Sequence, residues 1–127
     1  MVHSPWVAAL PSWKIELELV RPWLQQLDTD SYEQVVAALE ILAEFGPSSG
    51  RPMVDTIHGS RHKNMTELRP GSRGRSELRV LFAFDPRRQA IMLVAGDKSG
   101  DWSKWYTRNI RIADDLFDEH LEGVRGQ

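Results

Sequence analysis

Two apolar segments joined by a short turn constrain the fold of this chain more than any other feature. Residues 78–84 and 89–95 are rich in side chains that favour β-strands, and Asp85 and Pro86 between them suit a turn. Both segments are apolar at nearly every position. This predicts central strands that are buried on both faces, with helices on one side, rather than edge strands.

The sequence before this hairpin predicts one strand and two helices. Residues 13–19 alternate between apolar and polar, which indicates a half-buried strand, and residues 20–27 then change to a helical spacing. A longer helix follows, capped by Asp30 or Ser31, and stops at residues 46–47, which are Gly-Pro. We expect these two helices to form an antiparallel pair that packs on the sheet.

The rest of the chain adds one more strand and a C-terminal helix. Residues 46–52 form a loop rich in Ser, Gly and Pro, residues 65–69 a strand, and residues 70–75 a flexible basic connection. Apolar residues recur at helical spacing over residues 105–121. The predicted order is βααβββα. It describes an α+β fold with a small, mostly antiparallel sheet, two N-terminal helices on one face and a C-terminal helix.

Length and composition bound the domain. The 127 residues suffice for a single core, which we place at residues 13–122, with an N-terminal extension over 1–12 and a tail over 123–127. The absence of cysteine excludes disulfides and thiolate metal sites. The first residues contain two prolines and no basic region, so they predict neither a signal peptide nor a membrane span. We expect a soluble, cytoplasmic protein.

Basic residues gather in the middle of the chain, although the net charge is only −2. Residues 51–111 carry 13 basic and 6 acidic side chains, whereas residues 1–50 carry 2 and 7, and residues 112–127 carry 1 and 5. A basic segment in an otherwise acidic chain is a candidate phosphate-binding surface, provided that the fold gathers its charges on one face. The alternative is that these cations are solvated or paired with neighbouring carboxylates.

The first candidate cluster is cationic and surrounds the strand that precedes the hairpin. If this strand pairs with the first strand of the hairpin, Arg69 and Arg79 lie close together on one sheet. Burying the Arg79 guanidinium without a partner is costly, so it faces a groove or pairs with Glu67 or Glu77. The cluster also includes Arg61, His62, Lys63, Arg73, Arg75 and, beyond the hairpin, Lys98.

The second candidate cluster interleaves aromatic and charged residues over residues 97–106. Trp102, Lys104 and Tyr106 are of the types that stack unpaired bases and hold a nucleic-acid backbone. The structural alternative is that Trp102 or Trp105 packs under the C-terminal helix, because a large aromatic at helical spacing is usually part of a core.

Common motifs of catalysis and metal binding are missing. The chain has no phosphate-binding loop, dinucleotide fingerprint, zinc-protease motif or serine-hydrolase elbow. Its histidines, His3, His58, His62 and His120, are too scattered for a metal motif, and there is no cysteine. We therefore expect chemistry without a metal or another cofactor.

Several blocks of sequence, in order along the chain, resemble a single family. The blocks are Gly46-Pro47, Gly50-Arg51-Pro52, Gly59 to Arg69, Arg79 to Pro86, Gly96-Asp97-Lys98, Trp105-Tyr106 and Ile112-Ala113-Asp114. Over about residues 13–122 the chain resembles the phage-derived HigB-type branch of the RelE/ParE toxin superfamily. The RelE-like fold of that superfamily agrees with the predicted order of elements.

The resemblance implies the toxin of a type II toxin–antitoxin pair, an endoribonuclease that cleaves mRNA in the ribosomal A site without a metal. In such enzymes the 2′-hydroxyl attacks the adjacent phosphate, so the protein orients the strand, offsets developing charge and moves protons. The implied partners are a helix-turn-helix, HigA-like antitoxin and operator DNA, which is bound only through the antitoxin complex. No membrane is involved.

The resemblance also implies roles for individual residues. Arg79 falls on the superfamily's phosphate-stabilising arginine, Lys98 on a second catalytic cation, and Tyr106 on a tyrosine that acts in proton transfer. Arg69 and Lys63 fall in the basic region that precedes this arginine.

His62 is a further candidate that comes from the residues alone. Histidine is the usual general base near neutral pH, although a basic surrounding lowers the pKa of a histidine and favours hydrogen-bond donation instead. The catalytic candidates are then Arg69, Arg79, Lys98, Tyr106 and His62. The RNA-binding candidates are Arg61, Lys63, Arg73, Arg75, Trp102 and Lys104.

The overall charge leaves other functions open. Ribosome-dependent nucleases of the superfamily are usually basic, whereas this chain has a pI of about 6.1 and acidic helices that repel RNA. One alternative is a ParE-like poison that binds a protein target and cleaves no RNA. Another is a weakly active module that only binds its antitoxin.

Overall fold

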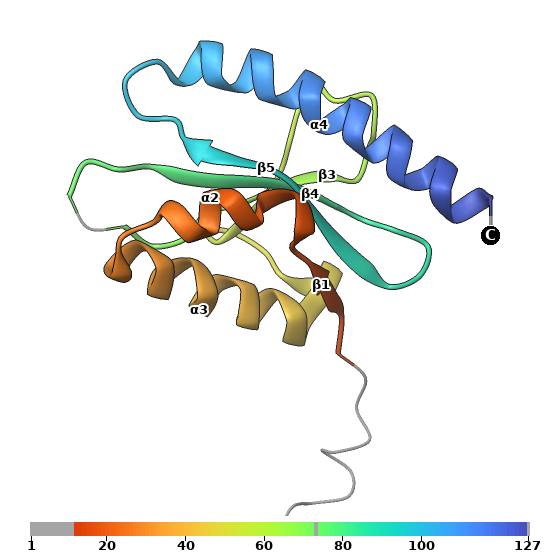
Figure 1. Ribbon diagram of the computed structural model, residues 1–127, viewed down its shortest axis with the longest axis horizontal. Helices are drawn as coiled ribbons and strands as arrows, with labels where there is room; N and C mark the ends of the chain where they lie inside the picture. The colour runs from red at the N-terminus through yellow and green to blue at the C-terminus, as the bar shows by residue number, and fades with distance from the viewer. Residues whose placement is uncertain (1–11, 73, 127) are drawn as a thin grey trace, which may run out of the picture.

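A five-stranded sheet with helices on both faces makes up residues 12–72 and 74–126, the part of the chain that the computed structural model describes (Figure 1). The strands lie in the order β1-β5-β4-β3-β2. Their bounds are β1 Lys14–Glu16, β2 Val54–Thr56, β3 Met65–Leu68, β4 Leu78–Phe84 and β5 Gln89–Asp97. The helices are α2 Arg21–Gln26, α3 Thr29–Phe45 and α4 Trp102–Arg125, with the 3₁₀ turns η1 Glu18–Val20 and η2 Gly46–Ser48.

The predicted hairpin lies inside the sheet. β4 pairs antiparallel with both β5 and β3, and β2 continues the antiparallel order at one edge. β1 runs parallel to β5 at the other edge. The expected α+β fold with a mostly antiparallel sheet is therefore confirmed.

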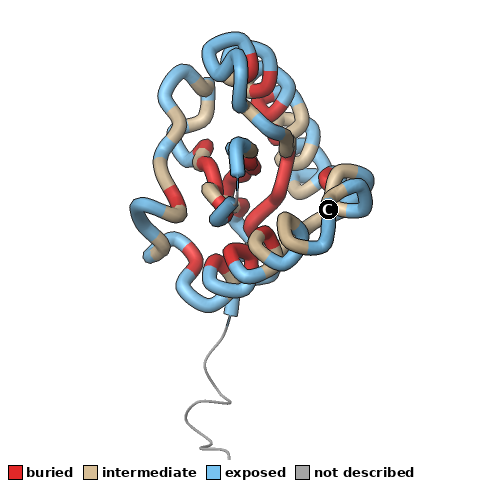
Figure 2. The backbone as a smooth tube through the Cα atoms, turned by 90° about the vertical axis from the view of Figure 1, so that its left-hand side faces the viewer, coloured by how far each residue is buried: buried red, intermediate tan, exposed pale blue. Residues whose placement is uncertain are grey.

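Two apolar cores hold the helices against opposite faces of the sheet. Leu42 of α3 and Phe82 of β4 belong to the first core, and Phe117 of α4 and Leu81 of β4 belong to the second. Figure 2 shows the buried residues on the strands and on the inner sides of the helices. Helices cover both faces of the hairpin strands, not one side as the sequence predicted, because the alternating side chains are apolar in both directions.

A bulge in β5 decides which side chains face α4. Leu93 has no partner opposite it, because the register shifts between Leu81 and Phe82 of β4. Leu93 and Val94 consequently both belong to the core under α4. Beyond the bulge, Gly96 lies directly against the first turns of α4, where a side chain would meet the helix.

The strand predicted over residues 13–19 is shorter than expected. β1 ends at Glu16, whose carboxylate accepts a hydrogen bond from the Glu18 N–H (3.1 Å), and the chain turns into η1. The Val20 N–H then donates to the Leu17 carbonyl (3.0 Å). The alternating pattern thus covers a short edge strand followed by one 3₁₀ turn.

The cap of α3 is Asp28, not Asp30 or Ser31 as predicted. The Asp28 carboxylate accepts a hydrogen bond from the Ser31 N–H (2.7 Å), which satisfies one open donor of the first turn. This bond holds the pKa of Asp28 below its ordinary value. At the other end Gly46 has a φ of 53° and ends the helix, as its position before Pro47 predicts.

The edge strand β2 was not predicted, and it changes the order of elements from βααβββα to βααββββα. Val54–Thr56 pairs antiparallel with β3. A strand of three residues is too short to show a period-two pattern, so the sequence contains no clear signal for it. β2 matters for the site because it carries Asp55 beside β3.

The structure describes the C-terminal helix but almost none of the predicted N-terminal extension. The predicted N-terminal extension, residues 1–12, lies outside the described residues except for Ser12. At the other end α4 begins at Trp102 and continues to Arg125. Of the helices in the described residues, none is both apolar enough and long enough to cross a membrane.

Gly96→Ala is expected to destabilise the protein, because a Cβ at this position would lie 2.8 Å from Nε1 of the buried Trp105. Overpacking of this kind costs about 1–3 kcal/mol. Gly123→Ala is the matched control. No atom lies within 4 Å of a Cβ there, and alanine in place of glycine inside a helix stabilises by about 0.5–1 kcal/mol. Urea unfolding measures both variants, and shifts of the same sign would contradict this packing.

Candidate functional site

A cleft of about 670 Å³ lies between the sheet and the N-terminal half of α4. Strands β2 and β3 form one side, α4 forms the other, and the segments next to β4 and β5 close one end. A volume of this size is typical of sites for small ligands. The lining residues are Asp55, Thr56, Ile57, His58, Glu67, Arg69, Glu77, Lys98, Trp102, Tyr106 and Ile110.

The sheet register places the charged residues of the cleft in adjacent rows. Asp55 of β2 lies opposite Glu67 of β3, and Arg69 follows Glu67 by two positions, so that it projects from the same face. The register between β3 and β4, continued by one pair, places Arg69 opposite Arg79. The two arginines are neighbours on one sheet, as pairing of their strands predicts.

The buried carboxylate of Glu67 is the centre of the cleft. Its side chain is only 3% exposed, and it accepts hydrogen bonds from the Tyr106 hydroxyl (2.6 Å) and from Nε of Arg69 (2.7 Å). The Arg69 guanidinium also donates to Asp55 (3.2 Å). A carboxylate this deeply buried requires such partners, because an unpaired charge in the interior is strongly unfavourable. The network fixes the phenol of α4 against two strands.

Tyr106 is held in its protonated form. Burial raises its pKa most, and the hydrogen bond to Glu67 and the charge of Glu67 raise it further, to about 12. The guanidinium of Arg79 is close enough to act on the phenol in the opposite direction. At neutral pH Tyr106 is therefore a phenol that donates to Glu67, and it can give up or relay a proton rather than start as a base.

Arg79 has no carboxylate partner among the residues that the structure describes. The two carboxylates predicted as its alternative partners, Glu67 and Glu77, pair with other cations. Nη1 of Arg79 donates to the Leu78 carbonyl (2.8 Å), whereas Nε is buried and has no hydrogen-bond partner. This geometry favours an arginine that is available to a ligand over an arginine in a salt bridge within the sheet.

Lys98 brings a further positive charge to the same place. Its Nζ lies 3.7 Å from Oε1 of Glu77 and 5.8 Å from the centre of the Tyr106 ring. Its backbone N–H donates to the Glu77 carbonyl (3.0 Å), which ties the end of β5 to the start of β4. Arg69, Lys98 and Tyr106 line the cleft, and the Arg79 guanidinium acts on the Tyr106 phenol, so four of the five predicted catalytic residues lie in the cleft or next to it.

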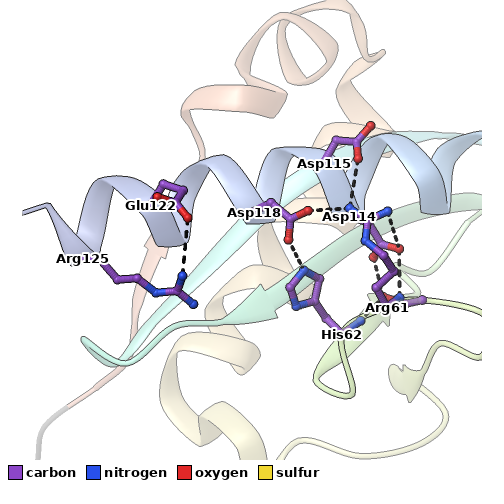
Figure 3. A network of polar contacts seen from close by, with 8 residues as sticks. Arg61, His62, Asp114, Asp115, Asp118, Glu122 and Arg125 are labelled. Atoms are coloured by element: carbon purple, nitrogen blue, oxygen red, sulfur yellow. Dashed lines mark hydrogen bonds and ion pairs between the residues drawn. The ribbon is translucent and has the colours of Figure 1, made fainter.

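His62, the fifth candidate, lies against the C-terminal half of α4 together with Arg61 (Figure 3). Its Nε2 is 2.7 Å from the Asp118 carboxylate, and its ring meets Phe117 edge-on. Asp118 follows Tyr106 by twelve residues, which is about 18 Å along a helix. The acidic residues of α4 therefore hold His62 away from the cleft. Those that pair with Arg61 are Asp114, Asp115 and Asp118.

The two tryptophans of the second cluster have different environments. Trp105 is buried in the core under α4, as the structural alternative predicts for one of them. Trp102 is 61% exposed and lines the cleft beside Tyr106. Trp102 is thus available to stack on a ligand, whereas Trp105 is not.

The other cations predicted to bind RNA, as far as the structure describes them, lie outside the cleft. Lys63 and Arg75 are exposed. Lys104 is exposed on α4, and its Nζ lies 3.7 Å from Asp101. Arg73 lies outside the described residues. Of the basic residues in the middle segment that the structure describes, only some therefore lie at the cleft.

Comparison with known proteins gives the family. The family model described as "Phage derived protein Gp49-like" matches residues 22–118. The chain belongs to this Gp49-like family. The matched range extends from α2 into the C-terminal half of α4, and it contains every residue that lines the cleft.

Two relatives of the Gp49-like chain come from Mycobacterium tuberculosis (strain ATCC 25618 / H37Rv). The chain is 60% identical to "Putative toxin HigB2" over 109 residues. These aligned residues make up 86% of this chain and 54% of that protein. It is 44% identical to "Putative toxin HigB3" over 112 residues, and these aligned residues make up 88% of this chain and 96% of that protein. The chain thus spans about half the length of the first relative and nearly all of the second. The predicted resemblance to HigB-type toxins is confirmed.

Several residues that line the Gp49-like cleft were not predicted as site residues, and three of them are Glu67, Asp55 and His58. Glu67 entered only as a possible partner for Arg79, although its position two residues before Arg69 on a strand places both side chains on one face. Asp55 lies on β2, for which the sequence contains no signal. His58 follows β2 in an irregular segment, and only the tertiary structure brings it to the cleft.

The charged groups of the Gp49-like cleft are arranged as ion pairs. Within residues 12–72 and 74–126, no three His, Asp or Glu side chains form a group that could hold a metal ion. The cleft carboxylates Asp55 and Glu67 pair with Arg69, and Glu77 pairs with Lys98. These residues can supply positive charge and protons to a reaction.

Glu67→Gln is expected to lower the pKa of Tyr106 from about 12 toward its ordinary value of 10.0, because it removes the charge and the strong acceptor that favour the phenol. Ultraviolet absorbance of tyrosinate during a pH titration measures this pKa. Subtracting the titration of the matching Tyr106→Phe protein isolates the signal of Tyr106. An unchanged pKa would show that Glu67 is not an ionised acceptor.

The same pKa predicts how stability depends on pH. The pKa of Tyr106 is higher in the folded protein than in the unfolded chain, so its contribution to stability is complete below about pH 10 and is lost as the pH rises through about 12. Across this window the urea midpoint of the wild type should fall more steeply than that of Tyr106→Phe. Parallel curves would contradict this linkage.

Proposed function

We propose that the protein is the toxin of a type II toxin–antitoxin system and that it cleaves mRNA, without a metal, through attack of a ribose 2′-hydroxyl on the adjacent phosphate. The names of its relatives support the toxin assignment. One observation carries the cleavage mechanism: the guanidinium of Arg79, which forms no ion pair with a carboxylate of the described residues, lies beside the hydrogen bond between Tyr106 and Glu67. A cation that is available to the phosphate and a proton relay are what this reaction needs from a protein.

Arg79 is proposed to offset the negative charge that develops on the phosphate. Its side chain is only half-buried, and a phosphate oxygen would accept a charge-assisted hydrogen bond from the accessible part of its guanidinium. Arg69 and Lys98 are already held by carboxylates, so they are fixed in position before the substrate binds. We assign them to orienting the strand around the reacting phosphate.

Tyr106 and Glu67 are proposed to move the proton of the nucleophile. As the 2′-hydroxyl attacks, its proton passes to the Tyr106 oxygen while the phenol proton passes to Glu67 along the existing 2.6 Å hydrogen bond. The raised pKa of Tyr106, about 12, suits a relay because the phenol stays protonated until the attack begins. Glu67 then releases the proton to solvent.

The bonds and protons of the reaction balance with the groups of the cleft. The new bond joins the 2′ oxygen to phosphorus, and the bond from phosphorus to the 5′ oxygen breaks. The leaving 5′ oxygen takes a proton from the Lys98 ammonium, which lies next to the Tyr106 ring and regains a proton from solvent. The products are a 2′,3′-cyclic phosphate and a 5′-hydroxyl end.

The substrate and partners are part of the same proposal. Ribosomal A-site mRNA is a single strand, and the exposed Trp102 at the cleft offers it a stacking surface. A HigA-like helix-turn-helix antitoxin would hold the toxin inactive and would bind operator DNA for the pair, in the cytoplasm. Arg61 and His62 position their segment on α4. Further proposed contacts to the RNA backbone are Lys63, Arg75 and Lys104, which lie outside the cleft, and Arg73.

Arg79→Met is expected to abolish cleavage without lowering stability. Removing one donor that stabilises the transition state lowers a rate about 10²–10³-fold. Stability stays equal or rises, because a buried Nε without a partner costs free energy in the folded protein. Growth after induced expression and mRNA 5′ ends mapped from the same cultures measure activity, and thermal unfolding of the purified variant measures stability.

Arg87→Met is the matched control, because Arg87 is an exposed arginine just beyond the opposite end of β4. It should arrest growth like the wild type, with new 5′ ends inside translated frames. Growth arrest by the wild type without new ends would refute the nuclease and favour a ParE-like poison of a protein target. No arrest at all would favour a module that only binds its antitoxin.

A further inference from the structure

The cleft continues into a second cavity along α4. This cavity, of about 500 Å³, shares four lining residues with the cleft: His58, Trp102, Tyr106 and Ile110. It extends past them toward Arg61 and Arg111. The four shared residues show that the two cavities adjoin along α4, and we call them together the groove, which reaches from the Glu67 centre along the side of α4.

The second cavity contains an aromatic surface and a cation without a partner. Trp102, 61% exposed, lies where the two cavities meet. Arg111 is exposed on α4, and within the described residues its side chain makes neither an ion pair nor a hydrogen bond. Arg61, by contrast, is occupied by the carboxylates of α4 (Figure 3). Arg111 is therefore the arginine of this cavity that is available to a ligand.

The one carboxylate that lines the second cavity is committed to the protein itself. Asp114 is buried, and it accepts hydrogen bonds from the Ser60 hydroxyl and from the Arg61 N–H (3.0 Å). It therefore contributes to holding the segment after β2 on α4 and leaves the charge of Arg111 uncompensated. The cavity as a whole suits an anion with a flat, unpaired ring beside it.

We propose that this second cavity is a nucleotide-binding subsite for single-stranded RNA, in which Trp102 stacks on a base next to the cleavage point and Arg111 binds the phosphate that follows it. His58, at the junction of the two cavities, lies between this nucleotide and the reacting phosphate. This subsite rests on the proposed RNA cleavage. With it, the protein also binds the strand beyond the two nucleotides that react. Aromatic stacking and a single phosphate contact make it tolerant of base sequence.

Binding of RNA that cannot be cleaved tests the subsite apart from the reaction. The probes are a fluorescent dinucleotide and a hexanucleotide that are fully 2′-O-methylated, so the nucleophile is blocked, and fluorescence anisotropy measures their affinity for the full chain. The wild type should bind the hexanucleotide at least about tenfold more tightly than the dinucleotide, because stacking on an aromatic side chain and a phosphate contact are added.

Arg111→Ala and Arg108→Ala form a matched pair for this test. Both are exposed arginines on α4 and both changes remove one charge, but Arg108 does not line the groove. Arg111→Ala should remove most of the advantage of the hexanucleotide and lower the slope of log affinity against log salt by about one. Arg108→Ala should change the affinity advantage of the hexanucleotide and the salt slope by less than about twofold. Trp102→Ala should also remove the advantage, and Trp102→Phe should restore much of it.

The outcomes separate the subsite from the nuclease. Equal effects of Arg108→Ala and Arg111→Ala, or equal affinity for the two oligonucleotides, would overturn the subsite even where mRNA is cleaved in cells. Failure of both oligonucleotides to bind would also overturn it. Binding of the hexanucleotide that depends on Arg111 and Trp102, without any cleavage in cells, would support the subsite and refute the nuclease.

Discussion

The buried Glu67 carboxylate, shared between Arg69 and Tyr106, is the interaction on which the rest of the site depends. It joins β3 to α4 through a charge that the interior tolerates only while both partners are present. The apolar core under α4 sets how close the helix comes to the sheet, but apolar contacts are not directional. The hydrogen bond from Tyr106 adds direction, because it fixes which side of the helix faces the cleft.

Specific contacts, both packing and polar, hold α4 at several points along its length. Near its start the Trp105 ring packs on Gly96, where the sheet has no side chain. Farther along, Asp114 binds the Ser60 hydroxyl and the backbone after it, and Asp118 binds His62 (Figure 3). The contacts of Asp114 and Asp118 anchor the segment that follows His58 on α4. Arg61 and His62 pair with carboxylates of α4, and neither of them lines the cleft.

Two features of the site are unfavourable for folding alone. Arg79 keeps a buried Nε without a hydrogen bond, and Trp102 keeps most of its surface in water. Each departs from a general tendency of folded proteins, since buried donors are usually satisfied and large aromatic side chains are usually covered. Trp102 lines the groove, and Arg79 lies beside Tyr106, which also lines it. Local departures of this kind are expected where a chain is selected for binding or chemistry.

The local pattern of the sequence was enough to predict the central hairpin, the helices and the basic middle segment, because each rests on residues that are close along the chain. It also placed Arg69 beside Arg79, since strand pairing alone does so. It could not reveal which cations are occupied. His62 binds Asp118, 56 residues away, and Tyr106 binds Glu67, 39 residues away. The sequence by itself therefore determined the elements and the supply of charge. Only the tertiary structure decided which charges neutralise one another and which remain for a ligand, because that depends on carboxylates brought in from distant parts of the chain.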